Sequence, residues 1–204
     1  MGVQKKDSTE EKILIAAQNV FTRKGMDGAR MQSIADEAGI NKALLHYYFR
    51  TKEKLFNAIF TKVFKRIYPN LMAMVNTEAP IETKIEKFVD TYINMLQDNP
   101  YLPSFLLKEM NRNANFIANI IHEHGVKLNE VFSMLTKEMD EGNIRKMDPR
   151  EILINLLSLC IFPIATKPLI TTMFFENDKV AYKQFIEDRK KTVTEFIINS
   201  IVIK

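Results

Sequence analysis

Apolar residues recur every three or four positions along almost the whole chain, which is the spacing of one face of an α-helix. No stretch shows a convincing alternation of apolar and polar residues, the pattern of a half-buried strand. Ser8 and Glu11 have the spacing of a capping box and predict a first helix that ends at Lys24 and Gly25. The pattern therefore predicts an all-α fold.

Two short helices are predicted next, over residues 31–38 and 42–48. Gly39 separates them, because glycine tolerates the left-handed turn with which a helix often ends. Three side chains can form the inner face of the second helix: Leu45, Tyr48 and Phe49. Two short helices joined by a tight glycine-containing turn make a helix-turn-helix, which places its second helix in the major groove of DNA.

The other side chains of the second helix point outward or lie at its edges. They are Asn41, Lys42, Leu44, His46 and Tyr47. Asn41 and Lys42 begin the helix, where backbone N–H groups and the helix dipole favour a phosphate. A small helical core with ordinary exposed polar residues is the alternative. Helix length, turn position and surface chemistry agree, and together they favour DNA binding.

Three segments carry a family resemblance: GMDGARMQSIA, AGINKALLHYYF and TKEKLF. Through them the chain resembles TetR-type transcriptional regulators over residues 9–64, and beyond that the likeness is one of architecture. The resemblance implies a phosphate contact at Lys52 and a divergent helical domain that binds a ligand and dimerises. The candidate DNA-binding residues are Arg30, Gln32, Asn41, Lys42, Leu44, His46, Tyr47 and Lys52.

Two residues depart from the family pattern. Arg30 stands where the family usually has Thr or Ser capping the first short helix, and arginine cannot accept a hydrogen bond from backbone N–H groups. It offers a contact to a DNA phosphate or base instead. His46 stands where tyrosine is common, so the operator preference of relatives cannot be transferred to this chain.

The rest of the chain is also predicted to be helical. A fourth helix starts after Thr51 and is predicted to end or bend at Pro69, which lacks a backbone donor. Further helices are predicted over residues 81–99, 103–111 and 114–141, from residue 149, and from residue 178 onward. We divide the chain into a helix-turn-helix domain (1–50), a linking helix (51–75) and a helical ligand-binding and dimerisation domain (76–204).

The C-terminal domain carries most of the phenylalanine and methionine side chains of the chain. Core packing explains most of them, and the functional alternative is that some line an apolar cavity for a ligand. The cavity candidates are Phe64, Met72, Tyr92, Met95, Phe105, Met110, Phe116 and Phe132. The last two helices are too apolar for a monomer surface, and two copies could bury them in a twofold four-helix bundle. The candidates for this dimer interface are Leu153, Leu157, Phe185, Val193, Phe196 and Ile197.

Positive charge is concentrated at the start of the chain. Residues 1–66 contain 13 Lys and Arg against 7 Asp and Glu, whereas residues 67–204 contain 16 against 18. The basic excess coincides with the helix-turn-helix and favours anion binding there. The rival hypothesis is a helical protein of the same fold that binds a protein partner instead of DNA. The basic bias counts against it.

Composition limits location and chemistry as well. No apolar run reaches the roughly 18 residues of a membrane span, and the N-terminus has no apolar signal core. The single cysteine, Cys160, fits a reducing cytoplasm, so we expect a cytoplasmic protein with no membrane partner. No catalytic motif and no histidine pair suited to a metal occurs, so we expect no enzyme, metal or cofactor. The expected function is that of a homodimeric repressor of a palindromic operator, released by a small apolar or amphipathic effector.

Overall fold

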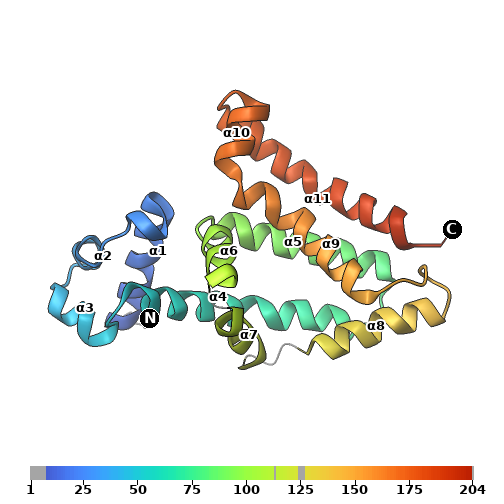
Figure 1. Ribbon diagram of the computed structural model, residues 1–204, viewed down its shortest axis with the longest axis horizontal. Helices are drawn as coiled ribbons and strands as arrows, with labels where there is room; N and C mark the ends of the chain where they lie inside the picture. Colours follow the sequence, from blue (N-terminus) through green and yellow to red (C-terminus); the bar gives the residue numbers. More distant parts are fainter. Residues whose placement is uncertain (1–7, 113, 124–126, 204) are drawn as a thin grey trace, which may run out of the picture. The chain divides into compact units, whose positions relative to one another are not determined.

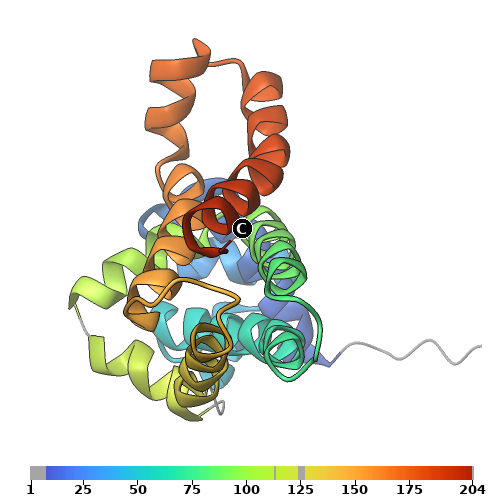
Figure 2. The same ribbon diagram turned by 90° about the vertical axis from the view of Figure 1, so that its right-hand side faces the viewer.

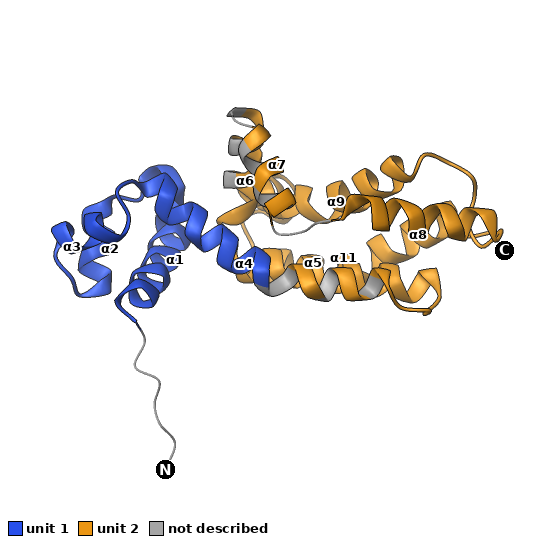
Figure 3. Ribbon diagram, turned by 90° about the horizontal axis from the view of Figure 1, so that it is seen from below, with its two compact units in different colours: residues 1–66 blue, residues 67–204 orange. Residues whose placement is uncertain are grey.

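The computed structural model describes residues 8–112, 114–123 and 127–203, which form helices joined by short turns (Figure 1). Within these ranges the only extended pairing is a single antiparallel bridge between Ile144 and Val202. The all-α prediction is therefore confirmed. The chain divides into two compact units, residues 1–66 and 67–204, which Figure 3 colours separately.

Unit 1 contains three helices and the start of a fourth: α1 (Thr9–Gly28), α2 (Met31–Ala38), α3 (Lys42–Tyr48) and the first part of α4 (Lys52–Val75). Each helix contributes side chains with no exposed surface to one core. These include Ile13, Ala17, Phe21, Ile34, Leu45 and Phe56. The rings of Phe21 and Phe56 lie 5.6 Å apart, so α1 and α4 meet at the centre of this core.

The starts of α1 and α4 in unit 1 are each capped by a side-chain hydroxyl. The Ser8 hydroxyl accepts a hydrogen bond from the Glu11 N–H at 3.2 Å, and the Thr51 hydroxyl accepts one from the Lys54 N–H at 3.2 Å. The end of α1 is less simple, because the helix kinks at Gly25 (φ 66°, ψ 172°) and then continues to Gly28. This backbone conformation is accessible almost only to glycine.

Unit 2 contains the end of α4 and seven further helices. They are α5 (Ile81–Asp98), α6 (Leu102–Arg112), α7 (Ala114–Glu123), α8 (Leu128–Asp140), α9 (Pro149–Ala165), α10 (Lys167–Phe175) and α11 (Lys179–Ile201). Helices α5, α9 and α11 pack side by side and supply most of the core (Figure 1). Helix α10 and the first turns of α11 extend beyond the other helices of unit 2 in both Figure 1 and Figure 2.

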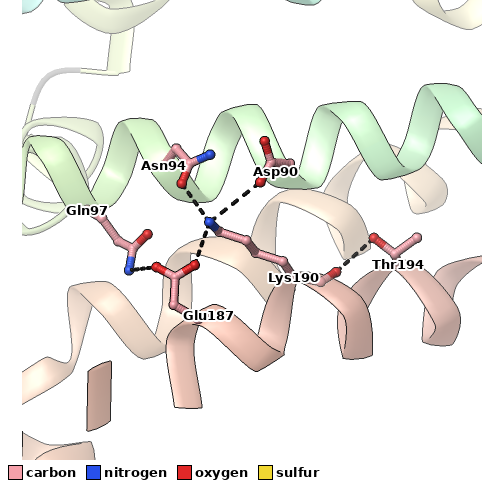
Figure 4. Close-up of polar contacts among 6 residues, drawn as sticks. All are labelled: Asp90, Asn94, Gln97, Glu187, Lys190 and Thr194. Carbon is pink, nitrogen blue, oxygen red and sulfur yellow. Dashed lines mark hydrogen bonds and ion pairs between the residues drawn. The ribbon is translucent and has the colours of Figure 1, made fainter. Parts of the chain in front are cut away.

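A polar cluster joins α5 to α11 (Figure 4). The Lys190 ammonium donates to the Asn94 side-chain oxygen at 2.6 Å and to the Glu187 carboxylate at 2.7 Å, and lies 3.5 Å from Asp90. Gln97 donates to the other Glu187 oxygen at 3.0 Å. Burial alone would lower the pKa of Lys190, but Glu187 and Asp90 hold it above its ordinary value. The hydrogen bonds from Lys190 and Gln97 lower the pKa of Glu187.

The predicted helix over residues 114–141 is wrong, because two helices occupy this stretch. Helix α7 ends at Glu123 and α8 begins at Leu128, after Lys127 in a non-helical conformation (φ −97°, ψ 75°). Gly125, a glycine between these two helices, lies outside the described residues. Apolar residues keep helical spacing on both sides of the break, so periodicity alone could not reveal it.

None of the prolines at positions 69, 163 and 168 ends the helix that contains it. Helix α4 does not end at Pro69 but runs on to Val75. Helix α9 likewise passes Pro163 and ends at Ala165, and α10 carries Pro168 in its first turn, where a missing N–H is harmless. In the described ranges no single helix is long and apolar enough to cross a membrane. Only α9 and α10 counted together reach that length, and they are bent by 74°.

The kink at Gly25 gives a prediction about stability. Gly25→Ala should lower the free energy of unfolding by about 1–3 kcal/mol, because alanine is strained at this backbone conformation. Gly28→Ala is the matched control, since its added Cβ would meet only Lys24 Cβ at an ordinary 3.5 Å. We expect the control to be neutral or up to about 1 kcal/mol more stable. Urea unfolding of both variants checks this, and equal effects would contradict it.

Candidate nucleic-acid interface

The turn between α2 and α3 has the geometry that the glycine predicted. Gly39 is left-handed (φ 66°, ψ 32°), and the N–H of Ile40 reaches back to the Ala35 carbonyl at 3.0 Å. This closes α2 with a Schellman-type bond. Helix α3 then starts at Asn41, whose side chain accepts a hydrogen bond from the Leu44 N–H at 2.7 Å. The two short helices and their turn therefore form a capped helix-turn-helix.

One face of α3 is open to solvent. Tyr47 is 82% exposed, while Leu45, two positions earlier, is completely buried. Tyr48 was predicted to face the core but is 40% exposed, and its ring meets that of Tyr47 edge-on at 5.5 Å. The prediction for Tyr48 is wrong, because the helix ends there; Phe49, in an extended conformation, lies in the core as predicted. Tyr48 therefore joins the candidate DNA-facing side chains.

His46 lies one turn after Lys42 along α3 and is partly exposed. Its Nδ1 atom is 3.2 Å from the carbonyl oxygen of Arg50. A carbonyl oxygen can only accept, so Nδ1 must carry the hydrogen of this bond. The contact ties the imidazole to the chain just beyond the end of α3.

The two candidates on α2 differ in freedom. Arg30 occupies the N-cap position, is exposed and makes no side-chain cap, as its chemistry predicted. Gln32 donates to the Asp36 carboxylate at 2.7 Å, one turn further along the same helix. The guanidinium group of Arg30 therefore takes no part in capping α2.

Lys52 also has a structural role that the sequence did not indicate. Its ammonium donates to the Ala29 carbonyl at 3.2 Å and lies 3.5 Å from that of Asp27. These bonds tie the start of α4 to the corner between α1 and α2. An ammonium has three donors, so a phosphate contact remains open to it.

Ion pairs also connect the helices of unit 1. Arg23 on α1 reaches the Glu37 carboxylate on α2 at 2.6 Å, and Asn19 donates to it at 3.4 Å. The hydrogen bond from Arg23 lowers the pKa of Glu37. Lys62 on α4 contacts Glu11 on α1 at 2.8 Å. These pairs are exposed, so they position helices more than they stabilise the fold.

Residues 13–59 match the sequence profile of the bacterial regulatory proteins of the tetR family. The match covers the capped helix-turn-helix, the kinked α1 and the start of α4. This region of the chain is similar to the N-terminal domain of the tetR-family regulators. The similarity supports DNA binding through the domain that contains α3.

Similar proteins agree with this assignment. The transcriptional regulator RutR of Escherichia coli is 23% identical over 188 residues, which cover 91% of this chain and 88% of RutR. The transcriptional repressor NicS of Pseudomonas putida is 38% identical over 61 residues, covering 30% of this chain and 29% of NicS.

Among solved structures, the transcriptional regulator FadR of Bacillus subtilis in complex with stearoyl-CoA shares the fold with a TM-score of 0.68. It is 17% identical, and the match covers 92% of this chain and 96% of FadR.

The candidate ligand residues whose side chains the structure describes have different surroundings. Phe64 belongs to unit 1, whereas the others belong to unit 2. Tyr92 and Met95 pack against the core of α5, α9 and α11, and Met72 is partly buried. Met110 is 52% exposed, and Phe132 lines a surface cavity of about 670 Å³ with Asn129, Ser133 and Thr136. The side chains of Phe105 and Phe116 lie outside the described part of the structure.

Tyr92 is the candidate with polar chemistry to offer. Burial raises the pKa of its hydroxyl, and the nearby Cys160 adds a smaller rise. Within the described residues this hydroxyl makes no hydrogen bond, whereas the Tyr182 hydroxyl donates to the Pro163 carbonyl at 3.1 Å. Phe88 lies beside Tyr92, with ring centres 5.6 Å apart.

The dimer candidates need a correction. Val193 and Ile197 are each 2% exposed and pack inside unit 2, so neither can be part of a surface. Phe196 is 62% exposed, and Leu153, Leu157 and Phe185 are partly exposed. All six candidates lie at apolar positions of the helical pattern. Only the packing of α11 against α5 and α9 shows which of its faces lies inside unit 2.

The open face of α3 gives a prediction for DNA binding. Tyr47→Ala should lower affinity for a selected operator about tenfold, equivalent to about 1.4 kcal/mol, without changing unfolding. Lys42→Ala should make the slope of log affinity against log salt shallower by about 0.9 for each phosphate that this lysine contacts. Fluorescence anisotropy over a salt series measures both. Lys137→Ala on α8 is the control, and an unchanged slope in Lys42→Ala would place this lysine away from the phosphates.

Proposed function

We propose that this regulator is a repressor that binds a palindromic operator as a twofold dimer and leaves it when a small amphipathic molecule binds unit 2. The observation that carries the proposal is the pairing of an exposed, capped recognition helix with a C-terminal unit whose last helices present large apolar side chains to solvent. The ligand-bound state of FadR is a precedent for the fold and not for the ligand of this chain.

The dimer proposal rests on neighbouring surfaces of α9 and α11. Ile154 and Phe162 on α9 are each 57% exposed, and Phe196 on α11 is 62% exposed. The two helices are tied together, because Arg189 on α11 donates to the Leu159 carbonyl on α9 at 2.9 Å. Two adjacent helices with apolar outward faces suit a four-helix bundle with a second copy. A twofold dimer presents two α3 helices, which implies a palindromic operator.

The effector proposal rests on Tyr92 and its surroundings. An apolar wall that includes Phe88 would hold the body of a hydrophobic ligand. The unbonded Tyr92 hydroxyl would donate to an acceptor on the ligand, such as a carbonyl or hydroxyl oxygen. This chemistry describes an amphipathic molecule. The effector must bind the state that cannot hold DNA more tightly, because equal affinity for both states shifts nothing.

The rival hypothesis is a protein of the same fold that binds a protein partner. Genome-wide selection of DNA fragments by the purified protein separates the two. The repressor proposal expects one palindromic site to be enriched and the isolated complex to dissociate on addition of effector. Enrichment of no site would favour the rival.

The dimer proposal predicts the effect of a charge on α11. Phe196→Asp should yield monomers at micromolar concentration and weaken operator binding, because two buried carboxylates would face each other. Leu128→Asp on α8 is the matched control, since Leu128 is 42% exposed and lies outside the proposed interface. Sedimentation velocity distinguishes the species. A dimeric Phe196→Asp variant would remove this part of α11 from the interface.

A second prediction compares two tyrosines. Tyr182→Phe should lower the free energy of unfolding by about 1 kcal/mol, because it deletes a buried hydrogen bond to the Pro163 carbonyl. Tyr92→Phe should leave unfolding unchanged within about 0.5 kcal/mol but weaken effector binding severalfold. Urea unfolding and titration of the operator complex with straight-chain acyl compounds of graded length measure the two effects. A Tyr92→Phe variant that is released as readily as the wild type would place the effector elsewhere.

A further inference from the structure

The orientation of His46 is set by the chain and not by DNA. Its Nδ1 donates to the Arg50 carbonyl at 3.2 Å. That carbonyl follows Phe49, which is 8% exposed and whose N–H donates to the Leu45 carbonyl at 2.8 Å. The acceptor for Nδ1 is therefore attached to a segment anchored in the core of unit 1. Turning the ring over would lose this bond.

The bond decides what the other ring nitrogen presents. In a neutral imidazole one nitrogen carries hydrogen and the other accepts, so the bonded Nδ1–H makes Nε2 an acceptor. Within the described residues Nε2 has no hydrogen-bond partner. His46 thus offers a single acceptor on a partly exposed helix whose neighbours Lys42 and Tyr47 are exposed.

We propose that His46 reads the exocyclic amino group of an adenine or a cytosine in the major groove. The inference rests on the proposed placement of α3 in that groove. Phosphate oxygens, guanine O6 and N7, and thymine O4 are acceptors and would face the Nε2 lone pair unfavourably. Adenine N6 and cytosine N4 are the donors on the major-groove edge. A tyrosine hydroxyl, the group common at this position in the family, can both donate and accept, whereas the Nε2 atom of this neutral tautomer can only accept.

The position of Lys42 is consistent with a base contact at His46. Lys42 is exposed one turn earlier, at the start of α3, where a phosphate is favoured. A phosphate contact at Lys42 positions the helix and carries no sequence information, whereas a base contact at His46 selects sequence.

The test uses the operator found by fragment selection and the full-length protein at pH 8. In successive duplexes, purine replaces each adenine and pyrimidin-2-one replaces each cytosine, which removes one exocyclic amino group at a time. We expect one position in each half-site at which the wild type loses about tenfold in affinity. His46→Ala should lose less than twofold at that same position. Because the duplex is weakened equally for both proteins, the difference between them isolates the contact.

Two further variants keep the test decisive. His46→Gln also presents an acceptor and should restore at least part of the discrimination, while His122→Ala, exposed on α7, should behave as wild type. Thermal unfolding shows whether His46→Ala is folded. If no position couples to His46, the inference is wrong. If His46→Ala instead makes the salt slope shallower by about 0.9, His46 contacts a phosphate and the inference is equally wrong. Failure to select any operator would overturn the proposed function itself.

Discussion

The proposed DNA-reading surface depends on anchoring a helix that would be only marginally stable alone. Isolated helices shorter than about 12 residues are marginal in water, and α3 has 7. Leu45 inside the helix and Phe49 just after it hold α3 to the core, and Asn41 satisfies a backbone donor at its start. With the inner side secured by these few groups, the outer side is free to carry Lys42, Leu44 and Tyr47. These three outward side chains are therefore not needed to hold α3 in place, whereas His46 and Lys52 are bonded to backbone carbonyls of unit 1.

The helices of unit 2 are joined by polar as well as apolar contacts. The Lys190 cluster connects α5 to α11 on one side of the core, and Arg189 connects α11 to α9 on another. Charge-assisted bonds of this kind have preferred distances and directions, so they fix the register of helices that apolar packing alone would leave free to slide. Helix α11 is held on two sides in this way. Phe196 is exposed on its outward face, which is the surface proposed for the second copy.

The sequence predicted features that depend on local chemistry. The all-α class, the Gly39 turn and the caps at Ser8 and Thr51 are all confirmed, because each is decided by residues within one turn of one another. Features that depend on distant residues were missed. Periodicity marks Val193, Phe196 and Ile197 alike as apolar, and only the contact of α11 with α5 and α9 separates the two buried side chains from the exposed one.

The same reasoning explains Lys52 and Tyr48. A lysine at a helix start is predicted to face solvent or phosphate, but the carbonyls of Asp27 and Ala29 come from a corner more than twenty positions away. Helical spacing predicts that Tyr48 faces the core. Because the helix stops at Tyr48, the extended Phe49 is the aromatic residue that lies in the core. In both cases the outcome is decided at the C-terminal end of a helix, α1 for Lys52 and α3 for Tyr48.

The free energy that one ligand contact contributes can be compared with the free energy needed to switch the protein between two states. A new hydrogen bond to the Tyr92 hydroxyl is worth about 1 kcal/mol, or roughly a fivefold preference for one state. In a symmetric dimer with one effector in each subunit the preferences multiply, to roughly twenty-five-fold. That factor is too small to move an equilibrium from almost all one state to almost all the other, which needs about 5.5 kcal/mol. The polar contact can therefore select the ligand, but most of the switching free energy must come from the apolar surface that the ligand buries in only one of the two states.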